Sequence, residues 1–139
     1  MESPDLLATV GIITRTKDRP VLLKRALESV SNQSYEDWHL VIVNDGGDPI
    51  AVDRLVSHYA TQLRDRVSVI HNPSSLGMEA ASNKGIRSIK TRYLAIHDDD
   101  DSWAPEFLTI AVAEIEHIRG KFPQVAGIIT LANTIYERV

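Results

Sequence analysis

Short apolar runs rich in β-branched residues alternate along the chain with longer segments in which apolar residues recur every three or four positions. The short runs predict buried strands, and the longer segments predict amphipathic helices. Proline at position 20 is typical of the first turn of a helix. We therefore expect strands at 9–13, 40–43, 67–70, 93–96 and 125–131, with helices over 20–30, 52–63, 78–89 and 107–118 between them.

This alternation predicts an α/β fold with a mainly parallel, Rossmann-like sheet covered by helices on both faces. In such sheets, ligands bind beyond the carboxyl ends of the strands, where the direction of winding switches. Three polar clusters directly follow expected strands, at 15–18, 44–47 and 98–101. We expect all three to meet at one edge of the sheet and to form one site.

Length and composition indicate one ordinary domain, residues 1–139, with a buried core. The 139 residues are 43% apolar and 24% charged, and none is a cysteine, which excludes disulfides and thiolate metal sites. No apolar run approaches the ~20 residues that span a bilayer, and the amino terminus lacks the features of a signal peptide. The net charge of −4 argues against a nucleic-acid partner. We expect a cytoplasmic protein without a membrane span.

Four consecutive aspartates, Asp98 to Asp101, form the most unusual feature of the sequence. Two unit charges ~4 Å apart repel by about 1 kcal/mol in water and about 4 kcal/mol near a protein surface. A bound Mg²⁺ or Mn²⁺, which prefers oxygen ligands, would remove this repulsion. The alternative is an acidic loop before a helix, with Asp101 or Ser102 as the cap. The position of the run directly after a strand favours the metal. Side chains alternate along an extended segment, so we expect His97 to pack or hydrogen-bond within the protein and not to bind the metal.

Four segments in order resemble the motifs of the family 2 glycosyltransferases. They are ITRTKDRP at 13–20, VIVNDGG at 41–47, LGMEAASNKGI at 76–86 and YLAIHDDDD at 93–101. The resemblance covers about residues 10–103. It implies the GT-A fold and an inverting enzyme that transfers a sugar from a nucleotide donor to a saccharide or another hydroxyl acceptor.

The resemblance also implies roles for residues around the donor. Arg15 and Lys17 would border the nucleotide base and ribose, and Asp45 would accept a hydrogen bond from the base, typically the imide of uracil. Asn83 would lie beside the diphosphate and the sugar. The family usually has an aromatic residue followed by Asn where this chain has Lys17-Asp18, so stacking on the base by an aromatic is absent here.

The acidic run is similar to the DxD motif of the family, which holds Mn²⁺ or Mg²⁺ as cofactor. Asp100 would be the main metal ligand and Asp98 a second one. Asp98 or Asp99 would hold the ribose or the donor sugar. Together these assignments describe a UDP-sugar site that depends on a divalent metal.

The general base of the family and most of its acceptor site lie in a second half of the fold, and nothing in residues 1–139 matches that base. We therefore expect the chain to be truncated before the acceptor-binding half. A nucleotide-sugar-binding module without catalysis remains an alternative. Another is a metal-dependent nucleotidyltransferase, although its glycine-rich phosphate loop is missing from residues 14–19.

Overall fold

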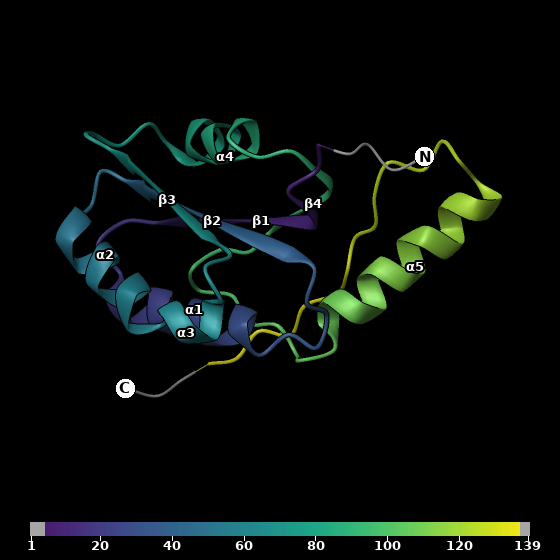
Figure 1. Ribbon diagram of the computed structural model, residues 1–139, viewed down its shortest axis with the longest axis horizontal. Coiled ribbons are helices and arrows are strands. Elements are labelled where there is room, and N and C mark those ends of the chain that lie inside the picture. Colours follow the sequence, from purple (N-terminus) through teal and green to yellow (C-terminus); the bar gives the residue numbers. More distant parts are fainter. Residues whose placement is uncertain (1–4, 137–139) are drawn as a thin grey trace.

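The computed structural model describes residues 5–136, so both ends of the expected 1–139 domain lie outside the described residues. Its centre is a parallel sheet with the strand order β3-β2-β1-β4 (Figure 1). Each of the four expected strands up to residue 96 is present, and β1 extends further along the chain than predicted. The strands are β1 (Ala8–Thr16), β2 (Trp38–Asp45), β3 (Val67–Asn72) and β4 (Thr91–Ile96).

Helices cover both faces of the sheet, as the sequence predicts. One face carries α4, and the opposite face carries α1, α2 and α3 (Figure 1). No helix within residues 5–136 has the length and apolar character needed to cross a membrane. The helices are α1 (Pro20–Ser31), α2 (Pro49–His58), α3 (Ala60–Leu63), α4 (Met78–Arg87) and α5 (Phe107–Lys121).

Alternate side chains of the central strands enter two separate apolar cores. Ile12 and Ile42 point to the face of α1 and are fully buried with helix residues such as Leu27. Ile13 and Val43 point to the face of α4. Because successive strand residues face opposite sides, the near-continuous apolar runs of β1 and β2 require a helix layer on each face.

The strand order creates a switch in winding direction beside β1. The chain passes from β1 to β2 and β3 in one direction and then returns to the other side of β1 to form β4. The register places Thr16 beside Asn44 on one side of β1 and Ile13 beside Ile96 on the other. The carboxyl ends of β1 and β4 therefore flank the switch point, where open α/β sheets bind ligands.

Two predictions about elements were wrong. The run at 125–131 forms no strand in the described part of the chain, although its composition is typical of one. A strand needs a partner backbone, and Ile129 and Leu131 are instead fully exposed. The single helix expected over 52–63 is two helices, because the chain turns at Tyr59, whose hydroxyl donates to Glu28 on α1.

Candidate functional site

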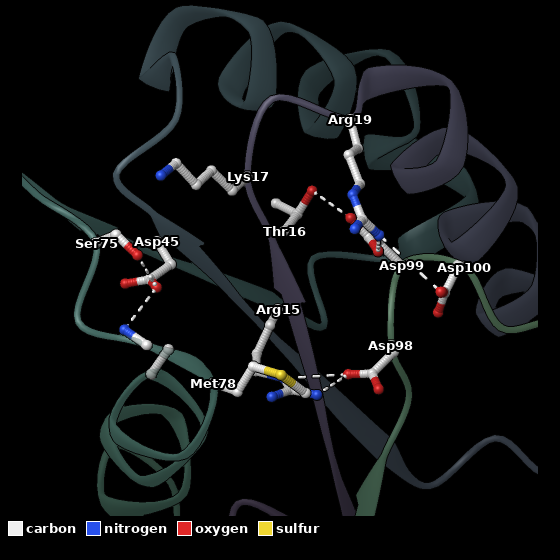
Figure 2. A pocket seen from close by; sticks show the side chains of 12 residues that line it. Arg15, Thr16, Lys17, Arg19, Asp45, Ser75, Met78, Asp98, Asp99 and Asp100 are labelled. Carbon is white, nitrogen blue, oxygen red and sulfur yellow. Dashed lines mark hydrogen bonds and ion pairs between the residues drawn. The ribbon is translucent and has the colours of Figure 1, made fainter.

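The three polar clusters meet, as predicted, around one cavity at the switch point (Figure 2). The cavity has a volume of about 310 Å³. Side chains from β1, from the end of β2 and from the loops after β1, β3 and β4 surround it, and the first turn of α4 lies along one side. Its lining consists of Arg15, Thr16, Lys17, Arg19, Asp45, Ser75, Gly77, Met78, Ala81, Asp98, Asp99 and Asp100.

Arg15 joins β1 to the acidic run after β4. Its Nε and Nη2 donate to Oδ1 of Asp98 at 3.1 and 2.5 Å. The arginine is mostly buried and the aspartate is partly exposed. Since β1 and β4 are neighbours in the sheet, an arginine late in one strand reaches a carboxylate just past the end of the other. One charge of the acidic run is balanced in this way.

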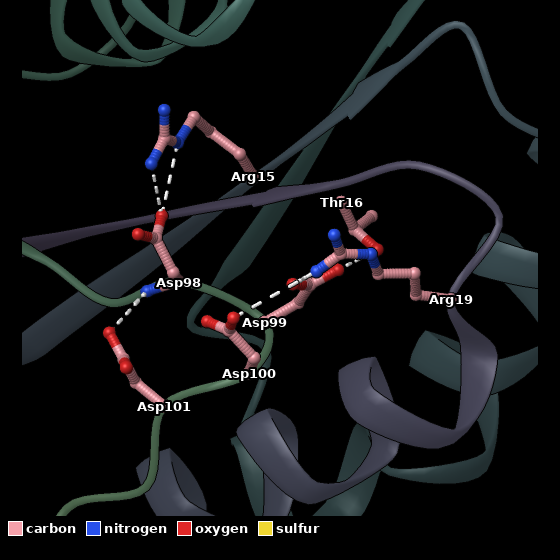
Figure 3. Close-up of polar contacts among 7 residues, drawn as sticks. All are labelled: Arg15, Thr16, Arg19, Asp98, Asp99, Asp100 and Asp101. Atoms are coloured by element: carbon pink, nitrogen blue, oxygen red, sulfur yellow. Dashed lines mark hydrogen bonds and ion pairs between the residues drawn. The ribbon is translucent and has the colours of Figure 1, made fainter. Parts of the chain in front are cut away.

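Asp99 is turned toward the loop after β1, where it meets Thr16 and Arg19 (Figure 3). Its carboxylate accepts from Thr16 Oγ1 and from Arg19 Nη1, both at 3.0 Å. Only 6% of the side chain is exposed. Burial raises the pKa of Asp99, while the bonds from Thr16 and Arg19 act to lower it. Asp99 therefore links the acidic run to the β1–α1 loop.

The other three carboxylates of the run can converge on one cation. Asp98, Asp100 and Asp101 each offer an oxygen, and these oxygens lie within 4.8 Å of one another. Oδ2 of Asp101 accepts from the backbone N–H of Asp98 at 3.3 Å, which folds the run back on itself. Burial, together with the neighbouring carboxylates, raises the pKa of Asp101. An all-oxygen set of this kind, two members of which line the cavity, fits Mg²⁺ or Mn²⁺.

The capping alternative for the acidic run is wrong. The helix after the run begins only at Phe107, and the residue at its N-cap is Glu106, whose side chain makes no capping bond. Asp101 and Ser102 lie several residues before this helix starts. The four carboxylates are therefore not explained by the end of a helix.

His97 packs, as expected, and belongs to the inside of the fold. Its ring is fully buried and lies edge-on to Trp103, with 4.3 Å between the ring centroids. Burial lowers the pKa of His97 to about 4, against the opposing effect of Asp98 and Asp100. The ring is therefore neutral at pH 7. The backbone N–H of His97 donates to Ile13 at 2.9 Å, which fixes the strand end just before the acidic run.

Asp45 ends β2 and is held by the loop between β3 and α4. Its carboxylate accepts from the side chains of Asn72 and Ser75 and from the backbone N–H groups of Leu76 and Gly77. Burial acts to raise the pKa of Asp45, but the four hydrogen bonds outweigh it and lower the pKa to about 2. Asp45 is therefore ionised over the whole physiological range.

The remaining two candidates occupy different places. Lys17 is exposed and lines the cavity just after β1. Asn83 is exposed on α4 and is not among the lining residues. Beside Lys17, Asp18 has a positive φ of 52° and accepts from the backbone N–H of Asp48 at 3.0 Å, which ties the loops after β1 and β2 together.

Sequence reasoning missed several residues that line the cavity. Thr16 belongs to the polar cluster 15–18 and Arg19 directly follows it, and this position beside Arg15 was the available signal. Met78 belongs to the segment 76–86 that the motif comparison already included, and Ser75 directly precedes that segment. Asp101 was considered only as a possible cap, in the alternative interpretation of the acidic run, yet its carboxylate lies with those of the expected metal ligands Asp98 and Asp100.

Comparison with protein families gives one match that covers most of the chain. The model described as "Glycosyl transferase family 2" matches residues 10–127. The putative colanic acid biosynthesis glycosyl transferase WcaA of Escherichia coli (strain K12) is 32% identical over 110 residues, which are 78% of this chain and 38% of that protein. The succinoglycan biosynthesis protein ExoW of Rhizobium meliloti (strain 1021) is 32% identical over 99 residues, 70% of this chain and 30% of its own length. The chain thus spans about a third of these relatives.

Solved structures share the fold. The mannosyltransferase PcManGT from Pyrobaculum calidifontis, in complex with GDP-Man and Mn2+, has a TM-score of 0.67 and 22% identity, covering 80% of this chain and 35% of that one. S. aureus TarS 1-349 in complex with UDP has a TM-score of 0.70 and 20% identity, covering 78% and 32%. At such identities the likeness concerns the fold, and it assigns the sheet and its helices to the GT-A type.

Proposed function

The chain belongs to glycosyl transferase family 2, and from this premise we propose that it binds a nucleoside diphosphate sugar through a divalent metal, for inverting transfer of the sugar to a hydroxyl acceptor. One observation carries the proposal. Oxygens of Asp98, Asp100 and Asp101 gather within 4.8 Å at the switch point, and the cavity beside them is also lined by basic side chains. The carboxylates could hold a divalent metal ion, and the basic side chains beside them could contact phosphate groups. Together they suit a nucleoside diphosphate with its bound metal.

In this proposal, each part of the cavity has a separate task. A cation held by Asp98 and Asp100 would neutralise the charge that develops on the departing nucleoside diphosphate. Lys17, exposed at the cavity, would contact the donor's phosphates or ribose. Arg15 and Arg19 would keep Asp98 and Asp99 in place through the bonds that they already make. Asp99, with its carboxylate thus held, would border the ribose or the sugar.

The fold neighbours support a nucleotide donor but differ in its base. One neighbour was solved with GDP-Man and Mn2+, and another with UDP. We propose Mn²⁺ or Mg²⁺ as the cofactor and UDP as the first nucleotide to test, because the resemblance of the second motif favours uracil. Without an aromatic residue at position 17, the base is not stacked on the β1–α1 loop.

We propose that the acceptor site and the general base belong to the remainder of a longer protein. The curated relatives are about three times as long as the segment that they share with this chain. The proposal already gives a binding or positioning task to each carboxylate that lines the cavity, which are Asp45, Asp98, Asp99 and Asp100. A module that binds nucleotide sugars without transferring them is the alternative, and a transfer assay on the full-length protein distinguishes the two.

Calorimetric titration tests the donor site directly. UDP, GDP and CDP would be titrated into the protein with Mn²⁺ and, separately, with a chelator. We expect at least one nucleotide to bind, and to bind more tightly with Mn²⁺. Equal affinity in both conditions would contradict the metal's role, and no binding of any nucleotide would contradict the donor site itself.

A further inference from the structure

We propose that Gln33, just after α1, is a positioning residue for the cation site, because it holds the segment behind the acidic run and so sets where the carboxylates of the run lie. This inference rests on the proposed function, since it concerns how the ligands of the proposed metal are kept in place. Gln33 lies outside the four motif segments and does not line the cavity. The residue is nevertheless buried, with 6% exposed, so its polar atoms require partners inside the protein.

The acidic run belongs to an irregular segment, residues 97–106, that joins β4 to α5. The segment contains no helix and no strand. Its backbone groups therefore depend on individual hydrogen bonds and not on a regular ladder. On the cavity side, Arg15 and Thr16 of β1 bond the first two aspartates of the run (Figure 3). Further along the segment, the bonds come from the end of α1.

Both ends of the Gln33 amide bond backbone groups where the segment meets α5. Nε2 donates to the carbonyl oxygen of Ala104 at 2.8 Å, and Oε1 accepts from the backbone N–H of Leu108 at 3.0 Å. Leu108 lies in the first turn of α5, where backbone N–H groups have no partner within the helix, and Glu106 at the N-cap makes no side-chain bond. An amide suits this place because it offers a donor and an acceptor together. Gln33 therefore caps α5 and fixes its junction with the segment.

Ser29 on α1 connects to the segment closer to the run. Its Oγ accepts from the backbone N–H of Trp103 at 2.7 Å, and its carbonyl oxygen accepts from Gln33 Nε2 at 3.3 Å. The indole of Trp103 packs against the rings of His97 and Phe107, with 4.3 and 4.6 Å between the ring centroids. Both ends of the segment thus meet on one indole, whose backbone is bonded to α1. The last aspartate of the run is only two residues away, so a shift here would move its carboxylate.

The position of the run matters because the ligands of a cation must converge. Oxygens of Asp98, Asp100 and Asp101 lie within 4.8 Å of one another. Asp98 directly follows β4 and is held by Arg15, so its place depends little on α1. The other two carboxylates come later, between this fixed point and the bonds of Ser29 and Gln33. Groups that orient metal ligands typically contribute about 10–100-fold to metal affinity.

The first test is Gln33→Met, because methionine has no N–H donor and only a weak acceptor. UDP, GDP and CDP would be titrated into the variant and the parent, with Mn²⁺ and, separately, with a chelator. We expect the variant to lose about tenfold in nucleotide affinity with Mn²⁺ and to behave as the parent does with the chelator. Hydrogen exchange at the amides of Asp101 and Leu108, which bond Asp98 and Gln33 in the parent, should become faster.

The second test is Ser29→Ala, which decides if Gln33→Met fails to fold. It removes only the acceptor of the Trp103 amide, so we expect a smaller loss, again confined to Mn²⁺, with faster exchange at Asp101. Tyr59→Phe is the matched control, because the Tyr59 hydroxyl also bonds α1 but does so at Glu28. It should change neither the nucleotide affinities nor the exchange at Asp101.

Two results would overturn the inference. If Gln33→Met, or Ser29→Ala in its place, binds nucleotide with Mn²⁺ as tightly as the parent, these bonds stabilise the fold alone. If the variant loses equally with Mn²⁺ and with the chelator, the loss does not arise at the cation. Failure of the proposed function is distinguishable from both, because the parent would then bind no nucleotide or bind it equally in both conditions. In that case unchanged exchange at Asp101 in Gln33→Met would separately exclude the hold on the run.

Discussion

Two arginines bring positive charge into an acidic run that would otherwise repel itself. Arg15 bonds Asp98, and Arg19 bonds Asp99 and lies 4.0 Å from Asp100. The pairing with Arg19 is only partly shielded from water, since about half of its side chain is exposed. These contacts offset part of the repulsion within the run, and they leave Asp100 as its least engaged carboxylate. Metal binding would then depend on Asp100 more than on its neighbours.

The low pKa of Asp45 gives a prediction for the stability of the protein in acid. Its pKa is about 2, below the ordinary 3.8, so the folded protein binds this proton more weakly than the unfolded chain does. The stabilisation is complete above pH 3.8 and is lost as the pH falls toward about 2. We expect the free energy of unfolding to fall more steeply over this interval in the parent than in Asp45→Asn, as measured by urea denaturation. Glu114 is exposed on α5, so Glu114→Gln should leave the dependence of the unfolding free energy on pH as in the parent. An equal dependence on pH in the parent and in Asp45→Asn would contradict the lowered pKa of Asp45.

Among the elements, α4 approaches the sheet closely because of a glycine. A Cβ on Gly85 would lie 3.0 Å from methyl groups of both Ile13 and Val43. We predict that Gly85→Ala destabilises the protein by about 1–3 kcal/mol, the usual cost of overpacking a core.

Gly120, near the end of α5, is the matched control, since a Cβ there meets nothing within 4 Å. Alanine is the better helix former by up to about 1 kcal/mol, so Gly120→Ala should be neutral or stabilising. Urea denaturation of both variants checks this pair. A Gly85→Ala protein as stable as the parent would show that α4 can move away from the sheet at little cost.

The local sequence pattern predicted helices and strands correctly where a neighbouring element packs against them. The apolar runs of β1 and β2 were correctly predicted as buried strands, because helices cover both faces of these strands. The run at 125–131 was wrongly predicted as a strand, because a strand also needs a partner strand to pair with, and the local sequence does not specify that partner. Likewise, apolar residues keep their helical spacing from 52 to 63, which predicted one helix, yet the backbone turns at Tyr59 and divides it into α2 and α3.

The site was predictable in position but not in its internal bonding. The rule that loops after parallel strands share an edge brought Arg15, Asp45 and Asp98 together correctly. Which carboxylate faces an arginine and which faces the cavity depends on side-chain direction, and sequence spacing does not specify that. The turn of Asp99 toward Thr16 is the clearest case.

At the scale of the whole molecule, the proposed donor site lies in a chain that spans about a third of the curated relatives it matches. We predict that residues 1–139 alone bind a nucleotide but transfer no sugar at a meaningful rate. General acid–base catalysis contributes typically about 10²–10⁴-fold, and no base is recognisable in this part. The measurement is product formation from a UDP-sugar with Mn²⁺ and a range of hydroxyl acceptors. Turnover that a mutation within the chain abolishes would show that the base lies here.

The most direct test of the metal-dependent donor site is the melting temperature of Asp100→Asn with and without Mn²⁺ plus UDP. The change removes one of the mutually repelling carboxylates, so the free protein should be as stable as the parent or more so. Glu114→Gln is the control, and such surface changes usually stay within about 0.5 kcal/mol. We predict that Mn²⁺ with UDP raises the melting temperature of the parent and of Glu114→Gln, but not that of Asp100→Asn. A rise in Asp100→Asn as large as in the parent would contradict the account.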